Sequence, residues 1–287
     1  MTEPTPGLVI VDKPAGLTSH DVVSRVRRLA GTRKVGHAGT LDPMATGVLV
    51  VGIGRATRLL GHLLVTDKAY DATVVLGAAT STDDAEGEVL RRCDPSAVTV
   101  AAVADGVAAM VGDIDQVPSS VSAIKVDGRR AYDRVRAGER VDLPARRVRI
   151  DAIDITRIEL PEVDLTVRCS SGTYVRAIAR DLGDTLGVGG HLTALRRTAV
   201  GPFTLADAHT LEELAESFAL LPIADVARRC FRTVAVDAAQ AVAVGFGRRL
   251  DLRLPEPGPV ALFGPDGAFL ALYEERDGQA VAVAVFC

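Results

Sequence analysis

The chain has 287 residues, of which 48% are apolar and 24% charged, a composition typical of a globular protein. It is longer than a single hydrophobic core usually supports, so we expect one large domain and one small one. No apolar run approaches the roughly 18 residues that span a bilayer, and residues 1–6 lack the basic start of a signal peptide. We therefore expect a cytoplasmic protein without membrane contact.

Cysteine and histidine are few and scattered along the chain. The four cysteines form no C-x-x-C pair, and the five histidines include no H-E-x-x-H motif. Zinc ribbons and redox dithiols are disfavoured by this spacing. The sequence predicts a protein of a reducing compartment that holds no metal.

The formal net charge of −4 argues by itself against a nucleic-acid partner, but the charge is unevenly distributed. Residues 125–149 carry nine basic and four acidic side chains, and residues 21–34 carry five basic and one acidic. A mixed run of this kind can be an ordinary solvated face. Two basic segments on an acidic chain also suit a local track for phosphate groups, which is the hypothesis we carry forward.

The chain begins with a strand, a turn and a helix. Residues 8–11 are a short apolar run typical of a buried strand, and residues 12–16 form the turn that ends it. Thr18 and Asp21 have the spacing of a capping box, so a helix is expected after Thr18. Gly31 would end it.

The loop that follows has the features of a site. Residues 36–47 read GHAGTLDPMATG, and an apolar run over residues 48–51 follows them. Pro43 pushes the preceding Asp42 towards an extended conformation, so the loop holds one carboxylate on a stiffened backbone. An Asp-Pro pair among glycines is also ordinary turn chemistry, and the loop alone leaves both interpretations open.

The middle of the chain alternates strands with turns. Residues 52–57 resemble a dinucleotide fingerprint, but Thr57 replaces the third glycine and no βαβ repeat surrounds it. A strand is expected over residues 68–77, a turn-rich segment over 80–87 and a helix over 101–111. Residues 128–143 have few large apolar side chains, which indicates an exposed helix or excursion.

A second strand-loop-helix junction follows. Apolar and polar residues alternate over 163–169, which predicts a half-buried strand. Thr173 can cap a helix that ends at Gly187, and this places Tyr174 and Arg176 in its first turn. A further loop and strand over 189–203, a helix near 211–218 and a β-rich module after about residue 229 complete an α+β pattern with a largely antiparallel sheet.

Five stretches together resemble one known family. The loop GHAGTLDPMATGVL is similar to the catalytic motif of the TruB-type tRNA pseudouridine synthases. The segments at 8–16 (LVIVDKPAG), 68–77 (KAYDATVVLG), 169–176 (CSSGTYVR) and 190–203 resemble the family's other signatures, in the same order and at compatible spacings.

The resemblance implies a pseudouridine-synthase fold and a domain division. The fold is α+β, with a mixed, largely antiparallel central sheet flanked by helices and a small β-rich, PUA-like domain at the C-terminus. The catalytic domain would span 1–228 with a basic RNA-binding insertion at 125–149, and the PUA-like domain 229–287.

The resemblance also implies roles for single residues. Asp42 corresponds to the essential aspartate, Tyr70 to the tyrosine that stacks on the target base, and Arg176 to the arginine that pairs with the aspartate. The implied substrate-binding residues are His37, which helps to hold the flipped-out loop conformation, Tyr174 and Leu195 of the uracil pocket, and Lys13. The implied contacts with the RNA backbone are Arg129, Arg130, Arg146, Arg147, Arg196 and Arg197.

The implied reaction exchanges the N1–C1′ bond of uridine for a C5–C1′ bond at position 55, in the T-loop of tRNA. Nothing is oxidised, so no cofactor is expected, and the base must leave its stack to be reached. Asp42 would act ionised, as a nucleophile on the sugar or base or as a base at C2′. We expect a monomer whose partner is the T-stem-loop.

Other classes of protein remain as alternatives. A non-catalytic tRNA chaperone would need the same basic track, but an intact set of Asp42, Tyr70 and Arg176 favours the enzyme. A glycoside hydrolase normally needs two carboxylates at a defined separation, and only one stands in a site-like setting.

Overall fold

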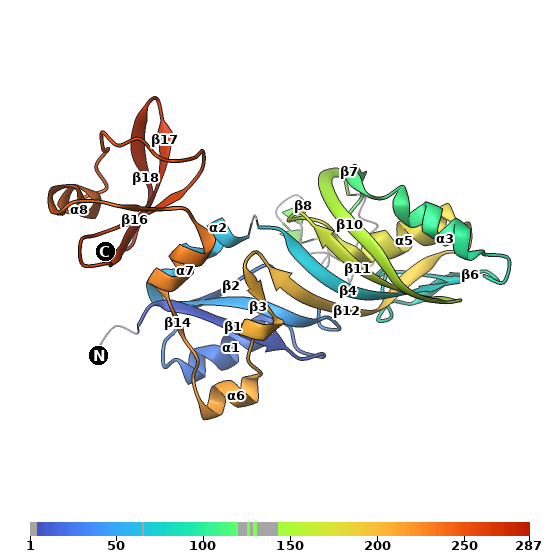
Figure 1. The fold of residues 1–287 in the computed structure, drawn as a ribbon. Coiled ribbons are helices and arrows are strands. Elements are labelled where there is room, and N and C mark those ends of the chain that lie inside the picture. The colour runs from blue at the N-terminus through green and yellow to red at the C-terminus, as the bar shows by residue number, and fades with distance from the viewer. Residues whose placement is uncertain (1–4, 65, 120–124, 127–128, 131–142) are drawn as a thin grey trace. The chain divides into compact units, whose positions relative to one another are not determined.

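The computed structural model describes residues 5–64, 66–119, 125–126, 129–130 and 143–287 (Figure 1). The chain divides into two compact units. The first comprises the residues up to 42 together with 48–64 and 201–287, and the second comprises 43–47 and 65–200. The chain therefore passes from one unit to the other directly after Asp42.

The second unit is built on an antiparallel sheet in the order β12-β4-β11-β10-β7. The first two residues of β3 pair in parallel with Arg196 and Arg197 of β12, which makes the sheet mixed. The predicted α+β class with a largely antiparallel sheet is confirmed. The elements of this unit are β4 (Lys68–Leu76), β5 (Ala78–Thr80), β6 (Val89–Arg92), α3 (Val100–Ala108), β7 (Gly112–Gln116), β8 (Lys125–Val126), β9 (Arg129–Arg130), β10 (Arg146–Glu159), β11 (Glu162–Cys169), α5 (Val175–Thr185) and β12 (Gly190–Val200).

Alternation along the strands gives this sheet a buried and an open face. In β4, Tyr70, Ala72 and Val74 are buried, whereas Asp71 and Thr73 between them face solvent more freely. The same alternation holds in β11, because successive side chains of a strand point to opposite faces. Figure 1 shows α3 and α5 on one side of the sheet, and their contacts with it cover the buried face.

Helix α5 packs unusually close to β12 because both elements place glycine at the contact. A Cβ added at Gly183 would lie 2.0 Å from the backbone nitrogen of Gly190. No side chain fits in that space. Gly183 lies near the C-terminal end of α5, so the close approach holds that end of the helix against the sheet.

The first unit contains a smaller sheet in the order β14-β1-β3, with β2 paired to the other end of β3. Helix α1 begins with the predicted capping box, in which Thr18 Oγ1 accepts from the Asp21 N–H and Asp21 accepts from the Thr18 N–H. The elements are β1 (Gly7–Lys13), α1 (Ser19–Leu29), β2 (Val35–Ala38), β3 (Thr46–Ile53), η1 (Gly54–Arg58), α2 (Leu60–Leu63), β13 (Phe203–Thr204), η2 (Leu205–Asp207), α6 (Leu211–Glu216), β14 (Leu221–Pro222) and α7 (Ile223–Cys230).

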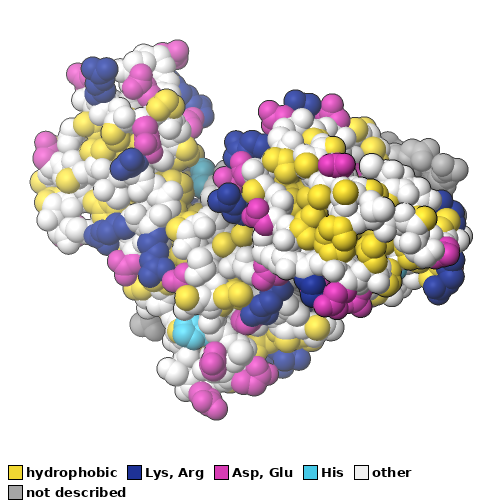
Figure 2. Space-filling view, turned by 45° about the vertical axis from the view of Figure 1, so that its right-hand side comes forward, with side chains coloured by type: hydrophobic (Ala, Val, Ile, Leu, Met, Phe, Trp, Pro, Cys, Tyr) yellow, Lys and Arg dark blue, Asp and Glu magenta, His cyan; other side chains and the backbone are white. Residues whose placement is uncertain are grey.

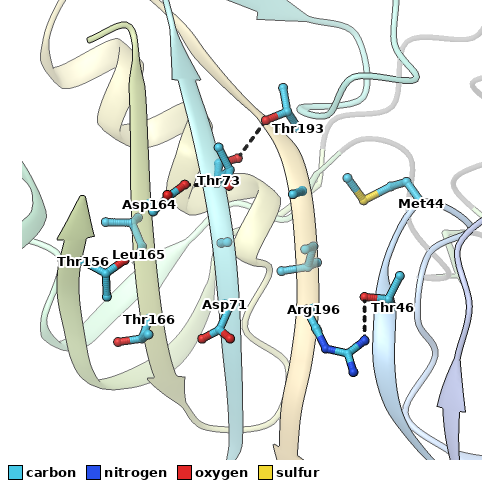
Figure 3. A pocket seen from close by; sticks show the side chains of 13 residues that line it. Met44, Thr46, Asp71, Thr73, Thr156, Asp164, Leu165, Thr166, Thr193 and Arg196 are labelled. Carbon is cyan, nitrogen blue, oxygen red and sulfur yellow. Dashed lines mark hydrogen bonds between the residues drawn. The ribbon is translucent and has the colours of Figure 1, made fainter. Parts of the chain in front are cut away.

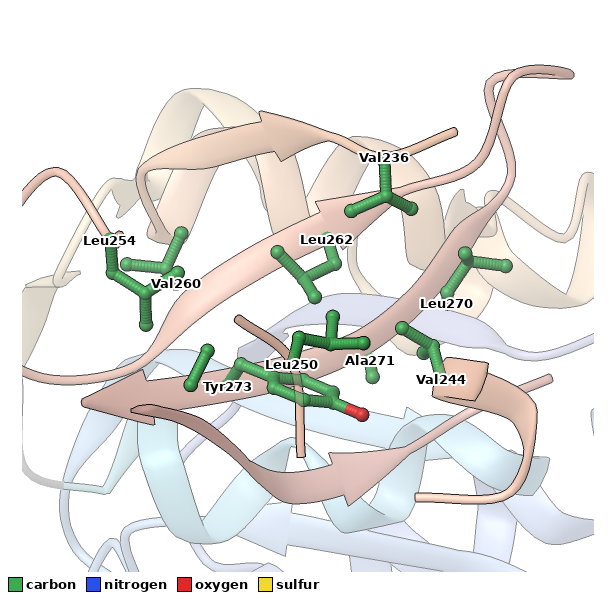
Figure 4. Close-up of a cluster of buried hydrophobic side chains, with 10 residues drawn as sticks. Val236, Val244, Leu250, Leu254, Val260, Leu262, Leu270, Ala271 and Tyr273 are labelled. Carbon is green, nitrogen blue, oxygen red and sulfur yellow. The ribbon is translucent and has the colours of Figure 1, made fainter. Parts of the chain in front are cut away.

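The end of the chain forms a four-stranded sheet with its own hydrophobic core. The strands run in the order β15-β16-β17-β18. Figure 4 shows Leu250, Leu262 and Tyr273 among the side chains that meet between this sheet and its helix. The Tyr273 hydroxyl donates to the Arg248 carbonyl at 2.8 Å, so its polar end is satisfied. The elements are β15 (Thr233–Ala235), α8 (Ala238–Gly245), β16 (Val260–Phe263), β17 (Phe269–Arg276) and β18 (Gln279–Val285).

Three local expectations differ from the structure. The 14-residue strand β10 begins inside the basic run, where no strand was expected. The C-terminal module is β-rich as expected, but it also contains the helix α8, which the sequence did not indicate. The N-cap of α5 is Tyr174, because the Thr173 hydroxyl donates instead to the Ser170 carbonyl at 3.0 Å and holds the turn before the helix.

Most of the expected excursion at 128–143 lies outside the described residues. Among the residues that the structure does describe, no helix is long and apolar enough to cross a bilayer.

The close contact of α5 with β12 predicts the effect of one methyl group. Gly183→Ala should lower the free energy of unfolding by about 2 kcal/mol or more, because the added Cβ must push α5 away from Gly190. Urea denaturation would measure the change. Gly61→Ala is the control, since nothing lies within 4 Å of a Cβ added there. Equal stability of both variants would contradict the close contact.

Candidate active site

The loop that carries Asp42 is anchored at the preceding residue. Ser19, the first residue of α1, is buried, and its hydroxyl bonds both backbone groups of Leu41. The Leu41 N–H donates to Ser19 Oγ at 2.9 Å, and Ser19 Oγ donates to the Leu41 carbonyl at 3.1 Å. The capped start of α1 therefore fixes the backbone that leads into Asp42.

Two other predicted substrate-binding residues lie in the first unit. His37 is on β2, and its ring stands edge-on to the ring of His20 with 5.5 Å between centroids. Lys13 has no exposed surface, and its ammonium donates to the carbonyls of Pro14 at 2.9 Å and Leu17 at 2.6 Å. A side chain so enclosed does not reach a substrate in this conformation, and these bonds give Lys13 a role in holding the turn after β1.

Tyr70 and Leu195 lie on the buried face of the second unit's sheet. The register pairs Tyr70 with Arg197, and Ala72 with Leu195. Tyr70 and Leu195 are each 8% exposed, so a small part of each is open to solvent beneath α5. The structure thus places an aromatic and an aliphatic side chain on the same face of two neighbouring strands.

The adjacent arginines of β12 have different surroundings. Arg196 is half-buried on the open face and donates to Thr46 Oγ1 at 3.3 Å. Arg197 is 1% exposed on the opposite face, next to Tyr70. The expected contact of Arg197 with the RNA backbone is not compatible with this burial, because successive side chains of a strand cannot both face solvent on a half-covered sheet.

The start of α5 carries the other two predicted residues. Tyr174 is the N-cap, and Arg176 is the second residue of the helix. The Arg176 guanidinium is 4% exposed, donates to the Thr82 carbonyl at 2.7 Å and lies 3.3 Å from Asp84 Oδ2. Arg176 is therefore held by the turn-rich segment between β5 and β6.

Asp84 is a site residue that sequence reasoning missed. Its side chain is also 4% exposed. Asp84 Oδ1 accepts from the Thr82 hydroxyl and from the Glu86 N–H, the latter at 3.1 Å, so the carboxylate is bonded on both oxygens. The sequence showed only a polar turn at 80–87. Asp84 pairs with Arg176, which is more than ninety residues away, and such a pair leaves no local signal in the sequence.

A second cation, besides Arg197, lies on the same buried face as Tyr70. Lys68 of β4 pairs in register with Cys169 and Val200, and its ammonium donates to the Thr66 carbonyl at 2.8 Å. Burial, and next the nearby Arg197 guanidinium, lower the pKa of Lys68 to about 8. Burial also raises the pKa of the neighbouring Cys169 thiol to about 11. The face beside Tyr70 is therefore cationic and poor in water.

The open face of the sheet holds a separate groove of about 610 Å³ (Figure 3). Thr73 donates to Asp164 Oδ1 at 2.7 Å across it, and Figure 3 shows Asp71 and Arg196 on neighbouring strands. Leu195 contributes to its lining, whereas Tyr70, Tyr174 and Arg176 do not. The groove is lined by Met44, Thr46, Asp71, Ala72, Thr73, Thr156, Asp164, Leu165, Thr166, Thr193, Ala194, Leu195 and Arg196.

The basic run is described only in part. Arg146 and Arg147 open β10 and are exposed, and Arg147 lies 3.6 Å from Asp115. Arg129 and Arg130 form β9, which pairs with β8, and their side chains lie outside the described residues. On the face in Figure 2, basic and acidic side chains are interspersed rather than gathered by sign.

Comparisons with models of known protein families assign this chain to a family. The N-terminal domain of the TruB family pseudouridylate synthases matches residues 27–175. A tRNA pseudouridylate synthase B C-terminal domain matches 176–227, and the C-terminal domain of tRNA pseudouridine synthase II matches 231–287. The chain belongs to the TruB family of pseudouridine synthases, which are isomerases.

Individual relatives agree over the whole length. The tRNA pseudouridine synthase B of Streptomyces griseus is 56% identical, with all of both chains covered. That of Thermobifida fusca is 57% identical, with 98% of each chain covered. Among solved structures, a chain of a Cbf5-Nop10-Gar1 complex is 26% identical with a TM-score of 0.75, over 98% of this chain and 84% of that one. A chain of an H/ACA ribonucleoprotein bound to a substrate RNA containing 2′-deoxyuridine is 25% identical with a TM-score of 0.73, over the same shares.

The buried ion pair predicts a loss of turnover when its charge is removed. Asp84→Asn keeps the shape of the side chain but removes the buried carboxylate charge that lies 3.3 Å from the Arg176 guanidinium. We expect the rate of pseudouridine formation to fall by about 10-fold or more, with a lower melting temperature. Asp184→Asn is the control, because Asp184 pairs with Arg91 in solvent and such pairs contribute little. Unchanged turnover in Asp84→Asn would contradict a role for the pair.

The lowered pKa of Lys68 predicts a pH-dependent stability difference. Between about pH 8 and the usual Lys value of 10.5, the unfolded chain binds a proton at Lys68 that the folded chain does not. The free energy of unfolding of the wild type should therefore rise with pH in this window relative to Lys68→Met. Urea denaturation across the window tests this, with the exposed Lys34→Met as control. Parallel curves for wild type and Lys68→Met would contradict the lowered pKa.

Proposed function

We propose that this enzyme converts the uridine at position 55 in the T-loop of tRNA to pseudouridine, without a cofactor. The observation that carries the proposal is the full-length match to enzymes named tRNA pseudouridine synthase B. The motifs around Asp42, Tyr70 and Arg176 support it. The reaction needs no electron acceptor, since one glycosidic bond is exchanged for another within the same nucleotide.

The target uridine is extruded from the RNA and received at the buried face of the sheet. A stacked base is out of reach of side chains, so flipping must precede the chemistry. Tyr70 and Leu195 present partly open apolar surfaces from β4 and β12. In this proposal Tyr70 stacks on the uracil, Tyr174 and Leu195 line its pocket, and His37 helps to hold the flipped-out conformation of the RNA.

Asp42 is the proposed catalytic group. In the ionised form it can attack the sugar or the base, or remove the proton at C2′. Arg176 pairs with Asp42 in the proposed active complex and orients the carboxylate through its planar guanidinium. The two bonds of Arg176 to Thr82 and Asp84 support this role, because they fix the cation before any RNA arrives.

The RNA backbone is contacted by cationic side chains of the second unit. Arg146 and Arg147 at the start of β10 and Arg196 on the open face are the described candidates. Arg129 and Arg130 complete the set. Phosphate contacts of this kind supply affinity without sequence information.

The domain boundary and the cellular setting belong to the same proposal. We place the catalytic domain at 1–228 and a PUA-like RNA-binding domain at 229–287. The separate β15–β18 sheet and its hydrophobic core support this division. A monomer in the cytoplasm is the proposed form, and the four free cysteines suit a reducing compartment.

The proposal predicts that Asp42→Asn binds tRNA and does not turn it over. The substitution removes the charge but little volume, so the rate should fall by about 10³-fold or more with affinity nearly unchanged. Release of tritium from C5 of uridine in a tRNA transcript measures turnover, and filter binding measures affinity. Asp251→Asn, an exposed carboxylate of the C-terminal module, is the control.

The outcomes of this experiment distinguish a pseudouridine synthase from a non-catalytic tRNA chaperone. Release from a single T-loop uridine, lost in Asp42→Asn, supports substrate, reaction and catalytic residue together. Retained release in Asp42→Asn would overturn the assignment of that residue. Tight binding of tRNA by the wild type without any release would favour a chaperone.

A further inference from the structure

Gln116 is a buried polar residue that the proposed reaction does not use. It is the last residue of β7 and is 2% exposed. Its amide bonds both backbone groups of Tyr174, which is 58 residues away in the sequence. The Tyr174 N–H donates to Gln116 Oε1 at 2.8 Å, and Gln116 Nε2 donates to the Tyr174 carbonyl at 3.1 Å. The Gln116 side chain thus bonds the backbone N–H and the backbone carbonyl of Tyr174, as a paired strand would.

The position of Tyr174 makes this contact more than a satisfied polar pair. Tyr174 is the N-cap of α5, and no side chain caps the helix there. The direction of a helix is set where its first turn is fixed, and Arg176 lies in that turn. Gln116 therefore fixes α5 two residues before the guanidinium that binds Thr82 and Asp84.

Arg180 makes further bonds between the same segments. Its Nη2 donates to the carbonyl of Val117 at 2.8 Å, and its Nη1 lies 3.2 Å from Asp83 Oδ2. Arg176 and Arg180, one turn apart on α5, thus bind the adjacent carboxylates of Asp84 and Asp83. The end of β7, the first two turns of α5 and the turn before β6 form one bonded unit.

We propose that Gln116 is a positioning residue for pseudouridine formation, which acts by holding Tyr174 and the first turn of α5 in the orientation that the uracil pocket requires. The inference rests on the proposed function, in which Tyr174 and Arg176 serve the target base. It assigns to Gln116 no contact with the substrate. Its effect is on the rate of the chemical step rather than on the affinity for RNA.

The first test separates rate from affinity. Gln116→Met keeps the length of the side chain and removes both bonds to Tyr174. We expect the single-turnover rate of tritium release to fall by about 10- to 100-fold, because small displacements of catalytic groups cost rates of this order. The dissociation constant for tRNA should change by less than about threefold. Gln279→Met, an exposed glutamine of β18, is the matched control and should keep the wild-type rate.

The second test asks whether the paired donor and acceptor are what matters. In Gln116→Glu, the protonated carboxyl offers the same donor and acceptor as the amide, whereas the ionised form offers only acceptors and repels the Tyr174 carbonyl. The rate of Gln116→Glu relative to wild type should therefore rise as the pH falls from about 9 to about 6, since burial raises the pKa of a carboxyl group. The same ratio for Gln116→Met should stay flat.

Each result decides the inference. A Gln116→Met rate within about twofold of an active wild type overturns it and leaves the proposed function standing. If Gln116→Met does not fold, the pH profile of Gln116→Glu decides, and a flat ratio overturns the positioning role. Wild-type protein that releases no tritium from tRNA overturns the proposed function and this inference with it.

Discussion

Burial of the Arg176 guanidinium is the constraint around which the site is arranged. A charge taken out of water costs several kcal/mol unless it is paired and fully hydrogen-bonded. Asp84 supplies the counter-charge at 3.3 Å, and Asp84 is itself bonded to the Thr82 hydroxyl and the Glu86 N–H. The turn before β6 therefore has to adopt one conformation, and α5 has to begin where its second residue can reach that turn.

Two other features also hold the backbone of the site in place. Gly183 and Gly190 let the C-terminal end of α5 approach β12 more closely than any side chain would permit, which holds the helix against the sheet. Ser19 bonds both backbone groups of Leu41, directly ahead of the proposed catalytic Asp42, and Gln116 bonds both backbone groups of Tyr174, itself a proposed pocket residue. Side chains that bond the backbone in this way fix loops without the help of regular secondary structure.

The two faces of the second unit's sheet carry different sets of the proposed site residues. Strand alternation puts Tyr70, Leu195 and Arg197 on the face beneath α5, and Asp71 and Arg196 on the open face with its groove. Adjacent residues in the sequence consequently have unlike surroundings. This is why Arg196 and Arg197, which share one expected role, are divided between solvent and the interior.

The sequence by itself determined the family, the α+β class, the capped start of α1, the loop of Asp42 with the strand after it, and the strand-loop-helix junction at Arg176. These depend on local signals: capping residues, glycines, alternation and motifs with fixed order. Only the tertiary structure decided that Lys13 and Arg197 are enclosed, that Tyr174 occupies the N-cap position of α5 and that Asp84 and Gln116 support the helix start. Each of these facts depends on contacts between segments far apart in the chain. Burial and long-range pairing are set by how the strands and helices pack, and no spacing along the chain encodes them.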